Sequence, residues 1–370
     1  MIDITIIRKA PFLGNPRLDK EVVSLASNYS VLVLAWDRKA KSYPFRNMVS
    51  PKIQHKVFVK HFNLKTSYGN VLFLFKFPIF WCWVLIQLLL STPKIIHSCD
   101  LDAIIPAYIY KFIRPKTKIV FDVWDNYSLD IWLQSHHRLC SFVAFFEDFF
   151  ALKSDSFILP TETRLKIFNR ARSRPVTIIM NYPCDVHFNS TQRSNKFRIV
   201  YAGKVENPVG LLKIANAIKD FSDIEFIVIG RVIDPNLFKM LLKFPQIKYV
   251  GEVSYIKALE FESSADLIPV MYNPEIPINR LANPNKFFEA MMLGVPVITN
   301  VMRNIIEKKK CGIMVDYNNL NSIKTAIQYL KENPFESKAM GQRGRIAFEQ
   351  EYNWSIMEKR LLTLYKNLIC

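Results

Sequence analysis

The sequence predicts an α/β protein built from two doubly wound domains, each with a parallel β-sheet covered by helices on both faces. Short apolar, β-branched runs recur along the chain and alternate with segments of helix length. Runs that are apolar at every position are typical of strands buried on both faces, and this alternation is typical of parallel sheets with right-handed crossovers. Twelve such runs are too many for one compact sheet, and 370 residues are enough for two domains with separate cores.

The first six runs predict the sheet of an N-terminal domain, residues 1–185. They begin near Ile4, Val31, Lys94, Lys118, Ser156 and Val176. A turn-rich stretch around Pro183 and a polar segment through Asn195 then predict a linker.

The remaining six runs predict a second domain, residues 186–350. They begin near Phe197, Glu225, Ile247, Asp266, Val295 and Gly312. Residues 351–370 repeat apolar side chains at helical spacing, so we expect a terminal helix that packs back across the domains.

Residues 71–91 are almost wholly apolar over the length that spans a bilayer. Lys76 and Pro78 interrupt this run, and the residues before it are rich in lysine. If the predicted strands on either side belong to one sheet, the chain cannot cross a membrane between them. The alternatives are a membrane span and a helix that is part core and part membrane contact, and we favour the contact helix.

Composition narrows the partners and the compartment. The net charge of +18 favours anionic partners, namely nucleic acid, an anionic membrane or phosphorylated ligands. Acidic residues are interspersed with the basic ones and no nucleic-acid-binding motif occurs, so we expect no nucleic acid partner. The six cysteines form no CxxC pair, and the N-terminus does not resemble a signal peptide, so we expect a cytoplasmic protein without a zinc site or disulfides.

The absence of several sequence motifs argues against several common enzyme classes. The chain has no GxGxxG, GxxxxGK[ST], HExxH or GxSxG motif. Dinucleotide oxidoreductases, P-loop enzymes, zinc peptidases and serine hydrolases therefore lack their usual sign.

Two predicted strands of the second domain end in a glycine followed by a cation, at Gly203–Lys204 and Gly230–Arg231. Ligands of open α/β sheets bind beyond the carboxyl ends of strands, where glycine admits a close backbone approach. Each cation could contact a phosphate there, or could simply be a solvated loop residue.

Residues 284–298 predict a helix that begins after Pro284, ends at Gly294 and leads into a strand. Asn285 and Lys286 then lie in the first helical turn, where unpaired amides and the helix dipole bind anions. Glu289 lies one turn later and could accept hydrogen bonds from vicinal hydroxyls, as in a ribose. The alternative is an ordinary surface pair of Lys286 and Glu289.

Taken in order, these segments resemble retaining family 4 glycosyltransferases of the GT-B fold. The resemblance covers nearly the whole chain and rests on these segments: FLGNPRLDKEVVSLASNYSVLVLAWDR, IIHSCDLDA, IVFDVWDN, IVYAGKVENPVGLLKIANAI, EFIVIGR, IKYVGEVSYIKALEFESSADLIPVMY, PNKFFEAMMLGVPVIT and YNWSIMEKRLLTLY. The implied fold is two Rossmann-like domains that face a central cleft.

The resemblance also implies site residues. Lys204 and Lys286 would bind the donor diphosphate and stabilise it as it leaves, and Glu289 would hold the ribose. The other donor-binding residues would be Gly203, Arg231, Val253, Asn285 and Phe288. The acceptor or sugar side would comprise Gly14, Asn15, Arg17, Asp100, Trp124 and Asp125.

Three positions depart from the family pattern. Leu281 stands where the family has the first glutamate of a pair, so Asn279, Arg280 or Asn283 would have to replace it. The second lysine usual near Val209 is missing, and Cys99 and Trp124 stand where many relatives have histidine.

The resulting expectation is a glycosyltransferase that moves a sugar from a nucleotide-diphosphate donor to a hydroxyl of a surface glycan carried on a lipid, with retention of the α-configuration. It would need no cofactor or metal ion and would associate peripherally with the inner face of the cell membrane. The alternatives are a nucleotide-sugar epimerase on the same scaffold and a catalytically silent subunit that binds glycan or a partner protein.

Overall fold

The chain folds into two compact units, which are treated separately below. The computed structural model describes residues 2–12, 16–37, 53–65, 75–129, 136–188, 195–276, 279 and 283–369. Unit 1 consists of Met1–Asn181 with Ser355–Cys370, and unit 2 consists of Tyr182–Trp354. The chain therefore passes from unit 1 to unit 2 at residues 181–182 and returns within the last helix.

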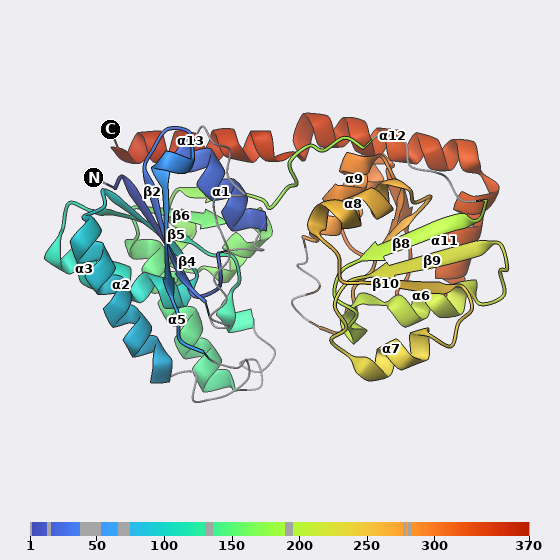
Figure 1. Ribbon diagram of the computed structural model, residues 1–370, viewed down its shortest axis with the longest axis horizontal. Coiled ribbons are helices and arrows are strands. Elements are labelled where there is room, and N and C mark those ends of the chain that lie inside the picture. Colours follow the sequence, from blue (N-terminus) through green and yellow to red (C-terminus); the bar gives the residue numbers. More distant parts are fainter. Residues whose placement is uncertain are drawn as a thin grey trace. The chain divides into compact units, whose positions relative to one another are not determined.

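Unit 1 contains a seven-stranded parallel sheet with the order β3-β2-β1-β4-β5-β6-β7 (Figure 1). Its strands are β1 (Ile4–Arg8), β2 (Val31–Trp36), β3 (Val57–Phe62), β4 (Ile95–Cys99), β5 (Lys118–Asp122), β6 (Ser156–Leu159) and β7 (Val176–Ile178). The central strands β1, β2 and β4 are buried almost throughout, as their continuously apolar sequences predict.

The sequence pattern does not predict β3. This strand lies at the sheet edge and its side chains alternate between more and less buried positions, with Lys60 and His61 among them. The burial pattern shows that the two faces of β3 are covered unequally, so this strand lacks the unbroken apolar run that marks strands covered on both faces.

Helices cover both faces of this sheet. They are α1 (Pro16–Ala26), α2 (Phe77–Ser91), α3 (Leu101–Ile113), α5 (His137–Lys153) and α13 (Trp354–Ile369). The helices α2, α3 and α5 supply Phe80, Val84, Ala107 and Phe150 to one apolar cluster with the sheet. The C-terminal helix α13 turns Leu361 and Tyr365 into the core of unit 1, and both are fully buried.

The apolar segment 71–91 contributes helix α2, and its residues 71–74 lie outside the described residues. In chain order, α2 connects β3 to β4, and both strands belong to the same sheet. Helix α3 packs beside α2. Within the described part of the chain, no helix has both the length and the apolar character needed to cross a bilayer.

Unit 2 holds two three-stranded parallel sheets, β10-β9-β8 and β11-β12-β13, whose strands β8 and β11 lie side by side. A hydrogen bond of 3.1 Å from the amide of Val200 to the carbonyl of Leu267 links them. The strands are β8 (Phe197–Ala202), β9 (Ile224–Ile229), β10 (Ile247–Gly251), β11 (Ile268–Val270), β12 (Val297–Thr299) and β13 (Gly312–Met314).

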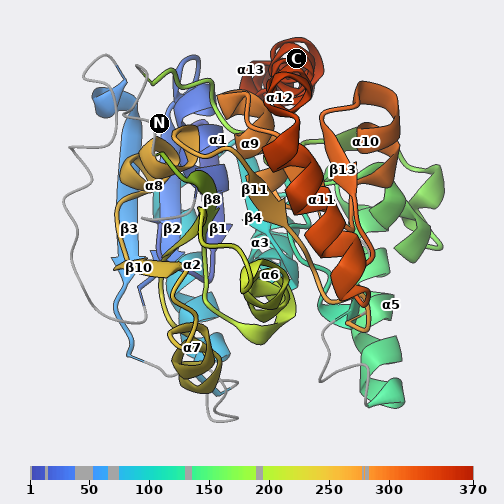
Figure 2. The same ribbon diagram turned by 90° about the vertical axis from the view of Figure 1, so that its right-hand side faces the viewer.

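The helices of unit 2 follow these strands in alternation (Figure 2). They are α6 (Leu211–Ile218), α7 (Pro235–Leu241), α8 (Tyr255–Ser263), α9 (Asn285–Leu293), α10 (Arg303–Lys309), α11 (Leu320–Glu332) and α12 (Pro334–Glu351). Gly294 ends α9 with a φ of 67°, a conformation that glycine adopts without strain. The predicted α/β class with parallel sheets and alternating helices is confirmed.

Candidate functional site

Three glycines bring the carboxyl ends of β8, β9 and β10 into close contact. The amide of Gly203 donates to the carbonyl of Ile229 at 2.8 Å, and the amide of Gly230 donates to the carbonyl of Gly251 at 2.7 Å. A Cβ atom on Gly230 would lie 2.1 Å from the carbonyl oxygen of Gly203. Only glycine fits this spacing, so these two strand ends can approach each other closely.

Lys286 extends from the first turn of α9 toward the strand end at Gly203. A Cβ atom on Gly203 would lie 2.5 Å from its Nζ, and the ammonium lies 4.9 Å from the ring centroid of Tyr201. The Tyr201 hydroxyl in turn donates to the carbonyl of Lys204 at 2.9 Å. The structure therefore brings together the glycine–lysine strand end and the helix start that the sequence singles out, and the side chain of Lys204 is exposed beside them.

Glu289 lies one turn beyond Lys286 on α9 and is 9% exposed. Its Oε1 accepts a hydrogen bond of 2.9 Å from the hydroxyl of Tyr255, the first residue of α8. Glu262 of α8 is buried nearby, and burial together with the Glu289 carboxylate raises its pKa well above the ordinary value. Sequence reasoning missed both Tyr255 and Glu262, because α8 carries no signal of a site.

Of the other residues predicted to bind the donor, two lie at a helix start or a strand end, and two have side chains that pack against apolar neighbours. Asn285 begins α9, and Arg231 is an exposed residue that follows Gly230. Val253 belongs to a small apolar cluster with Ile229, and its side chain is part of the packing there. Phe288 is 1% exposed, with its ring 4.6 Å from that of Tyr182, so its side chain lies in the core and offers no surface to a ligand.

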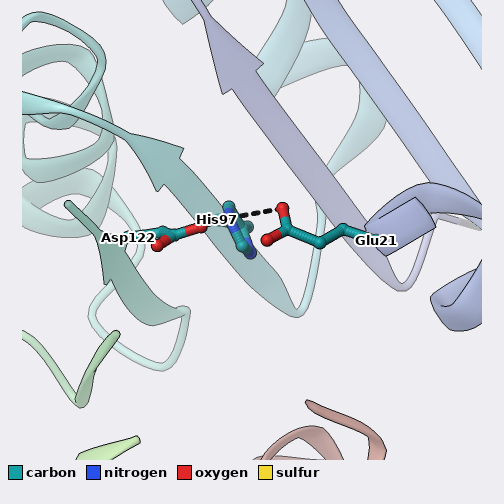
Figure 3. Close-up of side chains that lie close together, drawn as sticks. All are labelled: Glu21, His97 and Asp122. Atoms are coloured by element: carbon teal, nitrogen blue, oxygen red, sulfur yellow. Dashed lines mark ion pairs between the residues drawn. The ribbon is translucent and has the colours of Figure 1, made fainter. Parts of the chain in front are cut away.

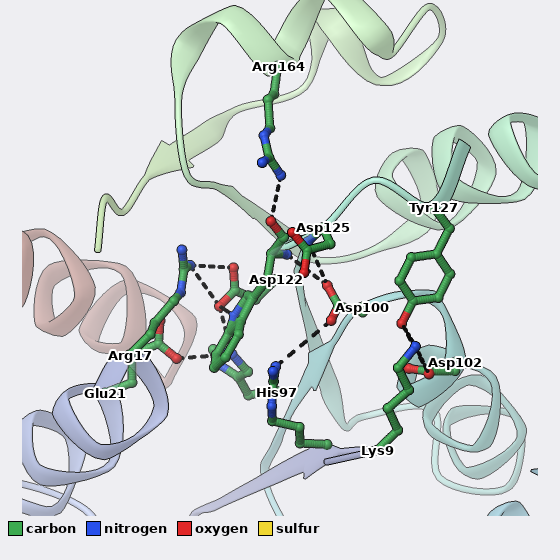
Figure 4. A network of polar contacts seen from close by, with 12 residues as sticks. Lys9, Arg17, Glu21, His97, Asp100, Asp102, Asp122, Asp125, Tyr127 and Arg164 are labelled. Carbon is green, nitrogen blue, oxygen red and sulfur yellow. Dashed lines mark hydrogen bonds and ion pairs between the residues drawn. The ribbon is translucent and has the colours of Figure 1, made fainter. Parts of the chain in front are cut away.

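Unit 1 carries a second group of polar residues at the carboxyl ends of β1, β4 and β5 (Figure 4). Arg17 of α1 binds both carboxylate oxygens of Asp122 at 2.7 and 2.9 Å and donates to Glu21 at 2.8 Å. All three residues are buried. Burial and the neighbouring Asp122 raise the pKa of Glu21 to about 7, while Arg17 keeps the pKa of Asp122 below its ordinary value despite burial.

His97 lies between the two carboxylates that Arg17 binds (Figure 3). Its Nε2 is 3.3 Å from Asp122 and 3.8 Å from Glu21, and its Nδ1 is 2.5 Å from the hydroxyl of Tyr365 on α13. Glu21, His97 and Asp122 thus have the ligand types of a metal site, with the ligand atoms within 4.8 Å of one another. The guanidinium of Arg17 already supplies positive charge to both carboxylates, so the group is best described as a buried ion-pair cluster.

Trp124 and Asp100 extend this cluster through hydrogen bonds. The indole of Trp124 donates to Asp122 at 2.5 Å, and the guanidinium of Arg8 lies 3.7 Å from its ring centroid. Asp100 accepts from the amides of Trp124 at 2.8 Å and Asp125 at 3.1 Å. Burial and the nearby Asp102 raise the pKa of Asp100 to about 7.

The backbone at Asp100 has a φ of 67° and a ψ of 173°, a conformation that residues other than glycine rarely adopt. Strained backbone of this kind is concentrated at functional sites, where surrounding contacts hold it. Here two hydrogen bonds, donated by backbone amides of the loop after β5, hold the Asp100 carboxylate.

The acceptor-side residues named from sequence therefore meet at one sheet edge in unit 1, as far as the structure describes them. Arg17, Asp100 and Trp124 are buried in contacts with one another, and Asp125 is exposed. Gly14 and Asn15 lie outside the described residues, as do Arg280 and Leu281.

Comparison with known proteins identifies the second unit. Residues 196–333 match the family described as glycosyl transferases group 1. Unit 2 therefore resembles group 1 glycosyltransferases over most of its length. The match contains β8 to α11, and so contains both Lys286 and Glu289. Among curated proteins, none matches the chain.

Solved structures extend the likeness to the whole chain. HepE from Anabaena, in complex with UDP and glucose, is 14% identical with a TM-score of 0.73, over 99% of this chain and 100% of HepE. Sucrose-phosphate synthase from Thermosynechococcus elongatus is 14% identical with a TM-score of 0.76, over 100% and 99%. These likenesses establish the GT-B fold of this glycosyltransferase.

The same fold occurs in another enzyme class. A putative UDP-N-acetylglucosamine 2-epimerase from Listeria monocytogenes is 12% identical with a TM-score of 0.64, over 99% of this chain and 96% of that protein. The fold alone therefore does not separate transfer from epimerisation, and the family match of unit 2 favours transfer.

Proposed function

We propose that this glycosyltransferase uses a UDP-sugar and transfers the sugar, with retention of configuration, to a hydroxyl of a glycan acceptor. The observation that carries the donor assignment is the position of the Lys286 ammonium, which the start of α9 holds against Gly203 with Glu289 one turn away. The UDP assignment is supported by HepE, whose structure was solved with UDP and glucose.

The proposed chemistry needs charge stabilisation rather than a protein nucleophile. As the bond to the sugar breaks, negative charge develops on the UDP diphosphate. Lys286, Lys204 and the amides of the first turn of α9 stabilise this charge, because donors already in place cost no reorganisation during the reaction. Glu289 accepts hydrogen bonds from the ribose. The two lysines supply positive charge, so we propose that transfer requires no divalent cation and continues in EDTA.

Isothermal titration calorimetry with UDP, GDP and dTDP tests the donor assignment. We expect UDP to bind best and Lys286→Ala and Glu289→Ala each to weaken it by about tenfold or more. Lys213→Ala is a matched control, because Lys213 also lies over a tyrosine ring of unit 2, 4.6 Å from that of Tyr317. If both site variants bind UDP like the control, the proposed site is wrong.

Product analysis tests the reaction class. Incubation with a UDP-sugar and glycan acceptors should yield a glycoside with the α-configuration of the donor, as read by NMR. Conversion of the UDP-sugar into its epimer without an acceptor would instead identify an epimerase. UDP-sugar binding with neither transfer nor slow hydrolysis would identify a silent binding subunit.

For the acceptor, we propose a lipid-linked glycan at an anionic membrane on the cytoplasmic side, contacted by unit 1. Large apolar side chains are exposed on the adjacent helices α2 and α3, with Leu90 72% and Phe112 90% exposed. Arg114 and Lys116 directly follow α3, and the chain carries a net charge of +18. Exposed apolar side chains flanked by cations are typical of surfaces that insert shallowly into anionic bilayers.

Sedimentation with vesicles of phosphatidylglycerol or phosphatidylcholine tests this membrane contact. We expect binding to the anionic vesicles at low salt, with weaker binding as ionic strength rises. Phe112→Ser combined with Leu90→Ser should reduce binding. Phe335→Ser is the control, because Phe335 is 91% exposed in unit 2. Equal binding by the double variant and the control would contradict the proposal.

A further inference from the structure

The side chain of Tyr255 links α8 to the donor-binding turn of α9. Tyr255 follows the Gly251–Val253 turn at the end of β10, and Ser254 caps the helix by accepting from the amide of Lys257. The residue is 44% exposed, yet its hydroxyl donates to Oε1 of Glu289 at 2.9 Å. A ring this exposed contributes little to the core, so the hydrogen bond is the specific contact of this side chain.

The surroundings keep the Tyr255 hydroxyl protonated. Burial of the hydroxyl and the adjacent Glu289 carboxylate both raise the pKa of Tyr255 far above its ordinary value. The hydroxyl therefore keeps its proton and remains a donor to Glu289. Hydrogen bonds to an ionised acceptor are stronger than those between neutral groups.

Glu262 is a second buried carboxyl group close to Glu289. It lies two turns after Tyr255 on α8, is 1% exposed, and is close enough to Glu289 to have its own pKa raised. Lys286 on α9 is the cation that acts in the opposite direction on Glu262.

We propose that Tyr255 is a positioning residue for donor binding, whose hydroxyl fixes the Glu289 carboxylate in the orientation that accepts hydrogen bonds from the ribose hydroxyls of UDP. This inference rests on the proposed function, in which Glu289 holds the ribose. A glutamate side chain has three rotatable bonds, and holding it in one orientation before binding lowers the entropy lost on binding. A carboxylate can accept about four hydrogen bonds, so the bond from Tyr255 is compatible with bonds to two ligand hydroxyls.

Calorimetry with two nucleotides separates positioning from general damage. Tyr255→Phe removes the hydroxyl alone, and we expect it to weaken UDP binding about 5- to 10-fold, in line with loss of one charge-assisted hydrogen bond. The same variant should bind 2′,3′-dideoxy-UDP within about twofold of the wild type, because that probe has no ribose hydroxyl for Glu289 to accept from. Tyr329→Phe, which alters a tyrosine of similar exposure on α11, should bind both probes like the wild type.

A double-mutant cycle supplies the second measurement. In a Glu289→Ala background, Tyr255→Phe should cause no further loss of UDP binding, because the group it positions is gone. Equal losses for UDP and the dideoxy probe, unchanged UDP binding by Tyr255→Phe, or additive losses in the cycle would each overturn the inference while leaving the donor site intact. A wild-type protein that binds neither nucleotide would refute the proposed function and, with it, this inference.

Discussion

The hydroxyl of Tyr365 lies 2.5 Å from Nδ1 of His97, and both side chains are fully buried. Tyr365 comes from the last helix of the chain and His97 from the centre of the sheet in unit 1. The two rings also stack, with an angle of 10° between their planes. This contact joins the C-terminal helix to the buried ion-pair cluster, since His97 is also 3.3 Å from Asp122.

Tyr365→Phe should therefore destabilise unit 1. Removing the hydroxyl leaves a buried histidine nitrogen without its partner, which costs about 1–3 kcal/mol of unfolding free energy. Urea denaturation followed by circular dichroism measures this loss. Tyr329→Phe, at a half-exposed position of α11, should change the midpoint little. Matching midpoints for the two variants would show that the His97 contact adds nothing to stability.

Arg17→Met should be more damaging. The substitution leaves the buried carboxylates of Glu21 and Asp122 without their cation, and breaking a buried ion pair from one side costs about 3–5 kcal/mol. Arg303→Met is the control, because Arg303 and Glu307 form an exposed pair for which about 0–1 kcal/mol is expected.

The neighbouring carboxylates offer a further check on Arg17. If unpaired charge causes the loss, combining Arg17→Met with Asp122→Asn should recover part of the lost unfolding free energy. A combined variant less stable than Arg17→Met alone would point to a packing defect.

Asp100 makes stability depend on pH with a defined sign. Its pKa is about 7 in the fold against an ordinary value of 3.8, with burial and Asp102 as the main causes. Between these two values the folded state keeps a proton that the unfolded state has released. The contribution of Asp100 to the unfolding free energy is thus fully present below about pH 4 and falls as pH rises toward 7.

Comparison with Asp100→Asn isolates this contribution. The amide cannot ionise but can still accept the two backbone hydrogen bonds, so the stability of the variant relative to the wild type should rise from pH 4 to pH 7 and then level off. Denaturation at several pH values gives this difference. A difference independent of pH would mean that the Asp100 carboxyl titrates normally in the fold.

The sequence pattern locates most strands because strands of a doubly wound sheet are covered on both faces and carry unbroken apolar runs. The edge strand β3 contains a lysine and a histidine, so the apolar pattern did not predict it. The start of α9 was predictable too, since Pro284 and Gly294 mark its ends.

The buried cluster of unit 1 was not predictable from the same signals. Glu21 reads as one more polar residue on a helix, and His97 falls inside an apolar strand. Their roles depend on Asp122 and Tyr365, which are far away in the sequence and meet them only in the fold. The motif that resembles the family also names Phe288, and only the fold shows that its ring packs against that of Tyr182 in the core.

Gly203 and Gly230, which follow strands β8 and β9, should respond differently to substitution by alanine. A Cβ atom on Gly230 would lie 2.1 Å from the carbonyl oxygen of Gly203, which is backbone and cannot move aside, and the φ of 125° at Gly230 is strained for any other residue. Gly230→Ala should therefore lower the thermal stability of unit 2. On Gly203 the new atom would meet the Nζ of Lys286 at 2.5 Å, the far end of a flexible side chain.

Gly203→Ala also strains the backbone, because the φ at Gly203 is 159°, but it clashes with a movable side chain and not with backbone, so it should destabilise unit 2 less than Gly230→Ala while displacing the Lys286 ammonium from the strand end. We expect UDP binding to weaken about tenfold, comparable to Lys286→Ala, with a melting temperature between those of Gly230→Ala and the wild type. The combination of Gly203→Ala and Lys286→Ala should bind no more weakly than Lys286→Ala alone, because both changes act through the same ammonium. Normal UDP binding by Gly203→Ala would mean that the contact of Lys286 with this strand end is not what holds the diphosphate.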